Sequence, residues 1–184
     1  GYVEEEGVPK RMLFSFQADG DECFAGTGER FAKMDLAGRG LTLQNEDGLG
    51  VNSRRTYKNI PFYLSSRPYG AFVHTSSRLD LSLAERSTRS VQGSVEDGSL
   101  DIFLLGGGRV REVLYHYCCL TGFSPELPLW SYGIWMSRMT YFSAEEIKGV
   151  AKRLRDEDFP CDVLHLDTGW FAKDWVCEWK FSPE

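Results

Sequence analysis

The middle of the chain carries the alternation of apolar and polar residues that is typical of half-buried β-strands. The alternation is strict at Leu79-Asp80-Leu81-Ser82-Leu83. Residues 91–96 and 100–105 are two further runs of this kind, and they flank Asp97-Gly98, a dipeptide suited to a tight hairpin turn. The pattern therefore predicts an antiparallel hairpin at this point of the chain.

A second pair of strand-like runs lies earlier in the sequence. Residues 60–65 and 71–75 flank the segment Arg67-Pro68-Tyr69-Gly70, whose proline and glycine favour a turn. Several short strands joined by turns, without helices between them, are typical of sheets packed face to face. The expected fold of this region is an antiparallel β-sandwich.

The alternating region ends at a short helix. The glycines at 106–108 break the strand pattern, and residues 110–120 then predict a helix, because their apolar members recur at helical spacing. These members are Val110, Val113, Leu114 and Tyr117. We predict a sandwich domain over residues 1–125 and a second domain over residues 126–184.

In the second domain, strand-like apolar runs alternate with a segment of helical periodicity. Residues 130–136 and 162–167 are apolar runs of strand type, and residues 143–158 between them predict a helix. Ser143-Ala144-Glu145-Glu146 has the form of a capping box, and Pro160 ends the helix. Apolar residues repeat on one helical face at Ile147, Val150, Ala151 and Leu154. The expected structure is the first βαβ unit of a (β/α)8 TIM barrel, interrupted after its second strand.

Composition narrows the classes of partner. Acidic residues outnumber basic ones by 27 to 21, and the basic residues are dispersed. Nucleic acid and anionic membranes are therefore not expected as partners. A neutral ligand is the expected partner. The five cysteines are odd in number and form no C-x-x-C pair, which favours reduced thiols and a cytoplasmic location. No apolar run has the length of a signal peptide or a membrane helix, and the chain starts at Gly1, so we expect a piece of a longer protein.

The second domain also holds the candidate binding residues. Asp167 ends the second predicted strand, and ligands of parallel α/β proteins bind at the carboxyl ends of strands. The alternative is a local role, in which Asp167 caps the turn that follows. His165 lies two residues earlier, so strand alternation places it on the same side, where packing in the interior is the more common role.

Aromatic residues near Asp167 are candidates for contact with a ring-shaped ligand. Trp170 and Trp175 could stack on the apolar face of a sugar or could simply pack in the protein. Tyr141 follows the first predicted strand and could reach the same pocket. The expected substrate-binding set is therefore Asp167, Trp170, Trp175 and Tyr141.

Three motifs in order resemble glycoside hydrolase family 31. They are Phe24-Ala25-Gly26-Thr27-Gly28-Glu29-Arg30-Phe31, Tyr57-Lys58-Asn59-Ile60-Pro61-Phe62-Tyr63, and residues 130–135. The resemblance implies a retaining enzyme that removes terminal α-linked sugars, as α-glucosidases and α-xylosidases do, with a β-sandwich ahead of a (β/α)8 barrel. His165-Leu166-Asp167 and Trp170 resemble the α-xylosidase branch, whereas Thr168-Gly169 differ from the cysteine-aromatic pair of some α-xylosidases, so both sugars remain open.

The resemblance also implies where the chemistry lies. The two catalytic aspartates of the family stand on later barrel strands, so no catalytic residue is expected in this chain and no hydrolysis by it alone. Asp167 occupies a position that hydrogen-bonds sugar hydroxyls in the family. The implied substrate is an oligosaccharide or another α-glycoside, and neither a metal nor an organic cofactor is needed. Alternatives are a carbohydrate-binding module and a purely structural sandwich, and assembly with a second copy remains possible.

Overall fold

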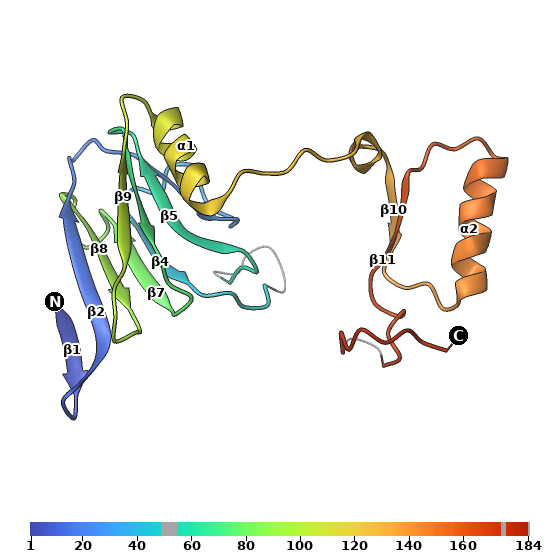
Figure 1. Ribbon diagram of the computed structural model, residues 1–184, viewed down its shortest axis with the longest axis horizontal. Coiled ribbons are helices and arrows are strands. Elements are labelled where there is room, and N and C mark those ends of the chain that lie inside the picture. The colour runs from blue at the N-terminus through green and yellow to red at the C-terminus, as the bar shows by residue number, and fades with distance from the viewer. Residues whose placement is uncertain (49–54, 174–175, 184) are drawn as a thin grey trace. The chain divides into compact units, whose positions relative to one another are not determined.

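The computed structural model describes residues 1–48, 55–173 and 176–183 and divides the chain into two compact units (Figure 1). The first unit spans Gly1–Phe123 and the second spans Ser124–Glu184. No helix of the described residues is both long and apolar enough to cross a membrane.

The first unit contains two antiparallel sheets. The five-stranded sheet has the order β1-β2-β8-β7-β4, formed by Tyr2–Glu5, Val8–Gln17, Ser90–Val95, Leu79–Leu83 and Arg39–Leu43. The four-stranded sheet has the order β3-β5-β6-β9, formed by Phe24–Gly28, Asn59–Ser65, Tyr69–Val73 and Ile102–Gly106. Buried side chains of both sheets share one core, so the two sheets form the predicted sandwich.

Strand alternation explains how the core is filled. Leu79, Leu81 and Leu83 of β7 are all buried, whereas Asp80 between them is partly exposed. Val91 and Val95 of β8 face the same core. β7 and β8 therefore each place an apolar row inside and a polar row outside, as the sequence pattern predicts.

The hairpin prediction holds for one pair of strands and is wrong for the other. β5 and β6 pair antiparallel, which confirms the earlier hairpin. By contrast, β8 pairs with β2 and β7, and β9 pairs with β6, so the chain crosses to the other sheet after β8. In the connection between them, the Asp97 carboxylate accepts hydrogen bonds from Ser99 N (3.1 Å) and from Ser77 Oγ (3.1 Å).

Backbone close approach explains the Gly-Thr-Gly motif at the end of β3. Gly26, Thr27 and Gly28 all have positive φ, and the pairing of β3 with β5 is irregular here. A Cβ atom on Gly28 would lie 2.2 Å from Lys58 O, so only glycine fits. The motif therefore shapes a β-bulge, and Arg30 beyond it donates to Asn59 Oδ1 at 2.6 Å.

Helix α1, Val110–Thr121, packs on the four-stranded sheet, as Figure 1 shows. Tyr117 stacks on Phe62 with ring centroids 4.0 Å apart, and Val113 is fully buried. The helix ends at Gly122, whose positive φ of 102° suits glycine. The predicted helix over residues 110–120 is confirmed.

The second unit contains two parallel strands and one helix. β10 (Trp135–Arg138) and β11 (Val163–Leu166) pair in parallel, and α2 (Ala144–Asp156) connects them. The helix begins as predicted, because Ser143 Oγ accepts the amide hydrogen of Glu146 at 3.1 Å. The strand predicted over residues 130–136 is wrong in its first half, where Leu129–Tyr132 form a 3-10 helix. Ser131 Oγ donates to Pro128 O (2.7 Å) and so supports the turn in place of an extended strand.

Candidate functional site

Asp167 lies directly after β11, at the carboxyl end of the two-stranded sheet. Leu164 lines a small cavity with Ala151 and Leu154 of α2, and Leu166 lines another with Ala144 and Ile147, so the even-numbered residues of β11 face the helix. Strand alternation then places His165 and Asp167 on the opposite face. Asp167 is exposed, and its carboxylate has no hydrogen bond or ion pair with any described residue. A free carboxylate at a strand end can accept hydrogen bonds from a ligand.

His165 is exposed on the same face of the described residues, so its packing in an interior stays a prediction. Its Nδ1 lies 3.0 Å from Ser137 Oγ of β10. This contact joins the two strands at the level just below Asp167. The open face of the sheet thus presents a row of polar groups leading to the candidate carboxylate.

Tyr141 and Trp170 are brought together on the other side of the sheet. With Leu166 and residues at the start of α2 they line a cavity of about 200 Å³, and Asp167 does not line it. Tyr141 is only 6% exposed, and its hydroxyl has no hydrogen-bond partner in the described chain. The Arg138 guanidinium lies 5.0 Å from the centre of the Tyr141 ring, in the position of a cation–π contact.

Trp170 belongs to an aromatic cluster. Its ring centroid lies 4.0 Å from that of Phe171, 5.2 Å from Phe181 and 6.0 Å from Trp179. Backbone pairing between Phe171 and Phe181 folds the end of the described chain back onto Trp170. Packing thus accounts for much of the Trp170 surface, and Trp175 lies outside the described residues.

A contact between the two loops that follow the strands was not foreseen from the sequence. Thr168 is 4% exposed, and its hydroxyl lies 2.5 Å from Thr140 Oγ1 and 2.9 Å from Met139 O. Gly169 allows this approach, because a Cβ atom there would lie 2.5 Å from Thr140 Cγ2. We call these residues, Met139, Thr140, Thr168 and Gly169, the clasp. The sequence feature that could have indicated this contact is the pair of small residues Thr168-Gly169 directly after Asp167.

The start of α2 carries the main charge pair of this region. Arg138 NH1 lies 2.8 Å from Glu146 Oε1, and Glu146 Oε2 accepts the amide hydrogen of Phe142 at 2.8 Å. The Phe142 hydrogen bond, together with the Arg138 charge, lowers the pKa of Glu146. These bonds fix the loop that holds Tyr141. Within the described ranges no cluster of three or more histidine, cysteine or acidic residues could hold a metal ion.

Two family models match the chain. Residues 3–81 match the glycosyl hydrolase 31 N-terminal galactose mutarotase-like domain, and residues 124–184 match the TIM-barrel domain of glycosyl hydrolases family 31. The chain belongs to glycoside hydrolase family 31. Its sandwich is thus the N-terminal type of domain found in this family.

Curated relatives of this family 31 chain include two α-xylosidases. The α-xylosidase of Emericella nidulans is 33% identical over 100% of the chain and 25% of its own length. The α-xylosidase XylQ of Lactiplantibacillus pentosus is 38% identical over 82% of the chain and 20% of its own length. The chain therefore spans about a quarter or less of these relatives.

Among solved structures, the family 31 dextranase of Flavobacterium johnsoniae, complexed with glucose, has a TM-score of 0.85. It is 24% identical, and the match covers 99% of the chain and 22% of the dextranase. At this identity the likeness concerns the fold.

Proposed function

We propose that this chain is part of a retaining exo-glycosidase that hydrolyses terminal non-reducing α-linked sugars, of the α-xylosidase or α-glucosidase type. The observation that carries the proposal is the free carboxylate of Asp167 at the end of β11, in a segment that matches the family 31 barrel domain. The two α-xylosidase relatives favour xylose as the first sugar to test.

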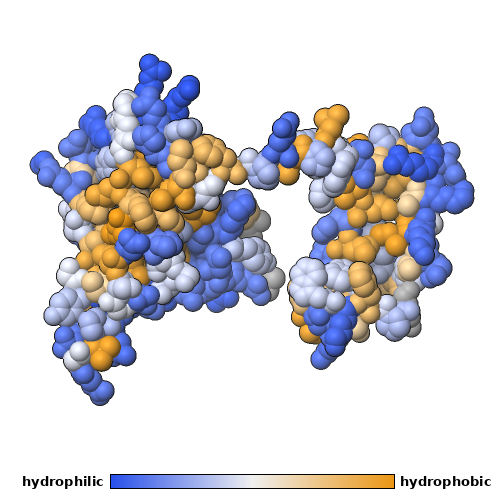
Figure 2. Space-filling model, viewed as in Figure 1, coloured by the Kyte–Doolittle hydropathy of each residue, from blue (hydrophilic) through white to orange (hydrophobic). Residues whose placement is uncertain are grey.

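The second unit is proposed as the start of the (β/α)8 barrel. Trp135, Ser137 and His165 are exposed on the face of the sheet opposite to α2, where a closed barrel would enclose them. Further large apolar side chains of this unit are also exposed, and Figure 2 shows the apolar surface that the two units carry. These exposed residues include Leu129, Tyr132, Met139, Phe142, Trp179 and Phe181. Additional barrel strands and helices would bury such surface.

Asp167 is proposed to bind the sugar and not to react with it. Retaining hydrolysis requires two carboxyl groups about 5–5.5 Å apart, one as nucleophile and one as acid and base. The segments directly after β10 and β11, residues 139–142 and 167–173, contain a single carboxylate, that of Asp167. The reacting pair must then come from other strands, and residues 1–184 alone are expected to be inactive.

A carboxylate suits the binding role because sugar hydroxyls donate hydrogen bonds and because charge-assisted hydrogen bonds are about twice as strong as neutral ones. The clasp would hold the backbone next to Asp167 in one position. Tyr141 and Trp170 would form the packed wall beside it, and stacking on the sugar remains the proposed role of Trp175.

The test is hydrolysis of aryl α-xyloside, α-glucoside and α-galactoside by the full-length enzyme and by residues 1–184. We expect one α-glycoside to be cleaved by the full-length form only. Asp167→Asn should lower kcat/KM about 10- to 100-fold, because a hydrogen bond to a charged group contributes about 1.5–3 kcal/mol. Asp156→Asn, which changes an exposed aspartate paired with Lys152 on α2, is the matched control and should leave kcat/KM unchanged. Equal kcat/KM for Asp167→Asn and wild type would remove Asp167 from the site.

A further inference from the structure

The outer face of the five-stranded sheet is hollowed. The hollow has a volume of about 640 Å³ and crosses strands β2, β8, β7 and β4. Its floor consists of the outward-facing row of each strand, whose side chains are polar apart from that of Leu13 on β2. The central members of this row are Ser15, Thr42, Asp80, Ser82, Gln92 and Ser94. We call this region the outer hollow.

One end of the outer hollow is closed by the turn between β7 and β8. Arg86 N donates to Ser82 Oγ at 3.1 Å, so the turn folds over the sheet, and Ser82 is only 4% exposed although it points outward. The Glu85 carboxylate lies over Gly40 of β4, where a Cβ atom would lie 2.6 Å from Glu85 Oε2. Glycine at position 40 thus makes room for a carboxylate on the floor.

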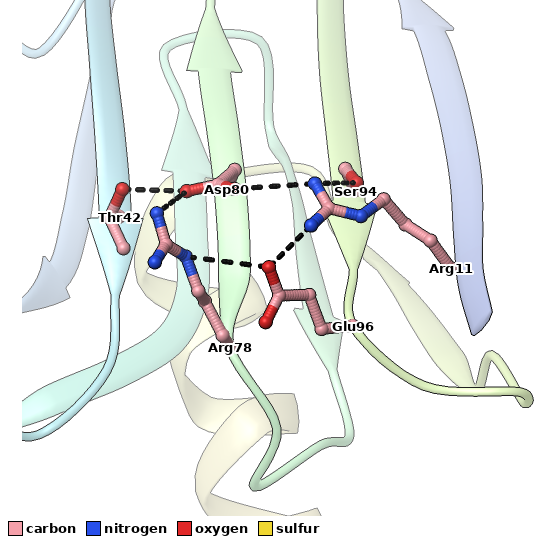
Figure 3. Close-up of polar contacts among 6 residues, drawn as sticks. All are labelled: Arg11, Thr42, Arg78, Asp80, Ser94 and Glu96. Atoms are coloured by element: carbon pink, nitrogen blue, oxygen red, sulfur yellow. Dashed lines mark hydrogen bonds and ion pairs between the residues drawn. The ribbon is translucent and has the colours of Figure 1, made fainter. Parts of the chain in front are cut away.

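The other end is bounded by a network of charged residues across the strands (Figure 3). Arg11 reaches from β2 to Glu96, to Ser94 Oγ (3.4 Å) and to Asp80 Oδ2 (3.8 Å). Arg78 lies 3.5 Å from Asp80 Oδ1 and 3.8 Å from Glu96 Oε1. From the other side, Thr42 Oγ1 donates to Asp80 Oδ1 at 2.6 Å. The network holds the Asp80 carboxylate in place on the floor of the hollow.

The side-chain charges of the outer hollow balance, and the Gly1 amino group, which also lines it, donates to Leu13 O at 2.9 Å. The two ends together contain three carboxylates and three guanidinium groups, on Asp80, Glu85, Glu96, Arg11, Arg78 and Arg86. No strong field of one sign arises, so neither a polyanion nor a polycation is favoured. Hydroxyl and carboxamide groups between the ends offer both donors and acceptors. A neutral ligand rich in hydroxyl groups fits this chemistry.

Two charged side chains of the hollow are free to contact a ligand. The Glu85 carboxylate and the Arg86 guanidinium have no hydrogen bond or ion pair with any described residue, whereas Arg11, Arg78, Asp80 and Glu96 are all paired. Solvated sheet faces are polar as well, but this face also has a turn that folds over it and a glycine that admits a free carboxylate to its floor. A volume of about 640 Å³ lies within the usual range of small-molecule pockets.

We propose that the outer hollow binds a neutral oligosaccharide on the sandwich itself. The choice of an oligosaccharide among neutral polyols rests on the proposed glycosidase function. Glu85 and Asp80 would accept hydrogen bonds from sugar hydroxyls, and Arg86 would donate to hydroxyl or ring oxygens. Because Glu85 and Arg86 have no partner to lose, their substitution should affect binding without unfolding the sheet.

The experiment is an amide NMR titration of the 184-residue chain with isoprimeverose and with maltotriose, and with glycerol as a small-polyol reference. We expect saturable shifts from at least one saccharide at residues 13–15, 40–42, 80–82 and 92–94. Glu85→Ala and Arg86→Ala should each raise the Kd about tenfold or more, as expected for the loss of a charge-assisted hydrogen bond. Glu29→Ala, which removes an exposed carboxylate paired with Lys58 elsewhere on the sandwich, should leave the Kd unchanged.

The same titration separates this proposal from the proposed hydrolase function. Shifts only at residues 163–170, abolished by Asp167→Ala, would overturn the outer hollow as a saccharide site and would support sugar binding by Asp167. No saturable shift at the hollow with either saccharide, or equal Kd values for Glu85→Ala and Glu29→Ala, would also overturn it. If the saccharide binds at the hollow but the full-length enzyme cleaves no α-glycoside, the outer hollow is supported as a saccharide site and the proposed hydrolase function is overturned.

Discussion

The two units of the chain use similar sequence signals but differ in how much they bury. The sandwich encloses a core with fully buried side chains from both sheets, among them Phe24, Tyr63, Leu83 and Val91. In the described part of the second unit, only Tyr141, Cys161 and Thr168 are buried, and α2 has no buried residue. Leu129 of this unit is 87% exposed and Trp179 is 79% exposed.

The number of packed layers explains the difference. The strands that supply the sandwich core have a partner sheet opposite their apolar row, so alternation is enough to close a core. The second unit has one helix against one face of a two-stranded sheet, and the other face has no covering element within the described residues. The candidate sugar-binding carboxylate lies on this uncovered face, whereas the outer hollow lies on a unit whose two sheets share one core. The comparison therefore predicts local stabilities that differ between the units.

The largest effect is expected from core truncation. Leu83→Ala should lower the free energy of unfolding of the sandwich by about 2–5 kcal/mol, because Leu83 is fully buried between the sheets. Leu164→Ala, the matched change on half-buried β11, should cost clearly less. Hydrogen exchange, measured separately for residues 1–123 and 124–183, gives the loss of stability in each variant. Separate measurement is needed because two units are not expected to unfold in one global transition. Equal losses in the two variants would contradict the comparison.

A smaller effect is expected at the clasp. Thr168→Val keeps the shape of the side chain but removes the hydroxyl that bonds Thr140 and Met139 O, which should cost about 1–3 kcal/mol within the second unit. Faster amide exchange over residues 139–142 and 166–170, with an unchanged sandwich, is the expected result. Thr168→Ser retains the hydroxyl and should keep most of the protection of these amides. If Thr168→Ser exchanges as fast as Thr168→Val, packing and not the hydrogen bonds stabilises the clasp.

Removal of the α2 cap should cost about 1 kcal/mol. Ser143→Ala deletes the oxygen that accepts the amide hydrogen of Glu146, and the first turn of the helix should open more often. Circular dichroism and amide exchange over residues 144–148 report this loss. Ser143→Asp, which keeps an acceptor at the same place, serves as the conservative control and should stay close to wild type.

The smallest effect is a pH dependence at the same helix start. The pKa of Glu146 is lowered in the folded state by the Phe142 amide and by Arg138, so the unfolded state binds its proton more readily. Its contribution is therefore present at neutral pH and above the unfolded pKa, and it is lost as the pH falls through the lowered folded pKa. The protection of the Phe142 amide, which is its exchange rate relative to the intrinsic rate at the same pH, should therefore fall on acidification, and Glu146→Gln should remove most of this pH dependence. An acid response of Phe142 that persists in Glu146→Gln would assign it to another group.

Much of the fold could be predicted because its signals are local. Leu79–Leu83, the helix after the glycines at 106–108 and the cap at Ser143 depend on contacts within a few residues, and all three are confirmed. The 3-10 helix at Leu129–Tyr132 was missed because its apolar residues resemble a strand when only hydrophobicity is read. For the candidate site, Asp167 followed from its place at a strand end, whereas the clasp depends on two loops separated by 28 residues.

By itself, the sequence determined strands β5 to β9 and β11, the two α-helices and the inward row of β7, because side-chain alternation and helix capping are set by neighbouring residues. Only the tertiary structure decided which strands pair. The Asp97-Gly98 signal suited a hairpin, yet β8 pairs with β2 and β7 in one sheet, and β9 pairs with β6 in the other. It also decided that Tyr141 and Trp170 face α2 while Asp167 does not line their cavity, and that outward residues of four strands form one hollow. Such arrangements arise from contacts between distant segments, whose partners no local pattern specifies.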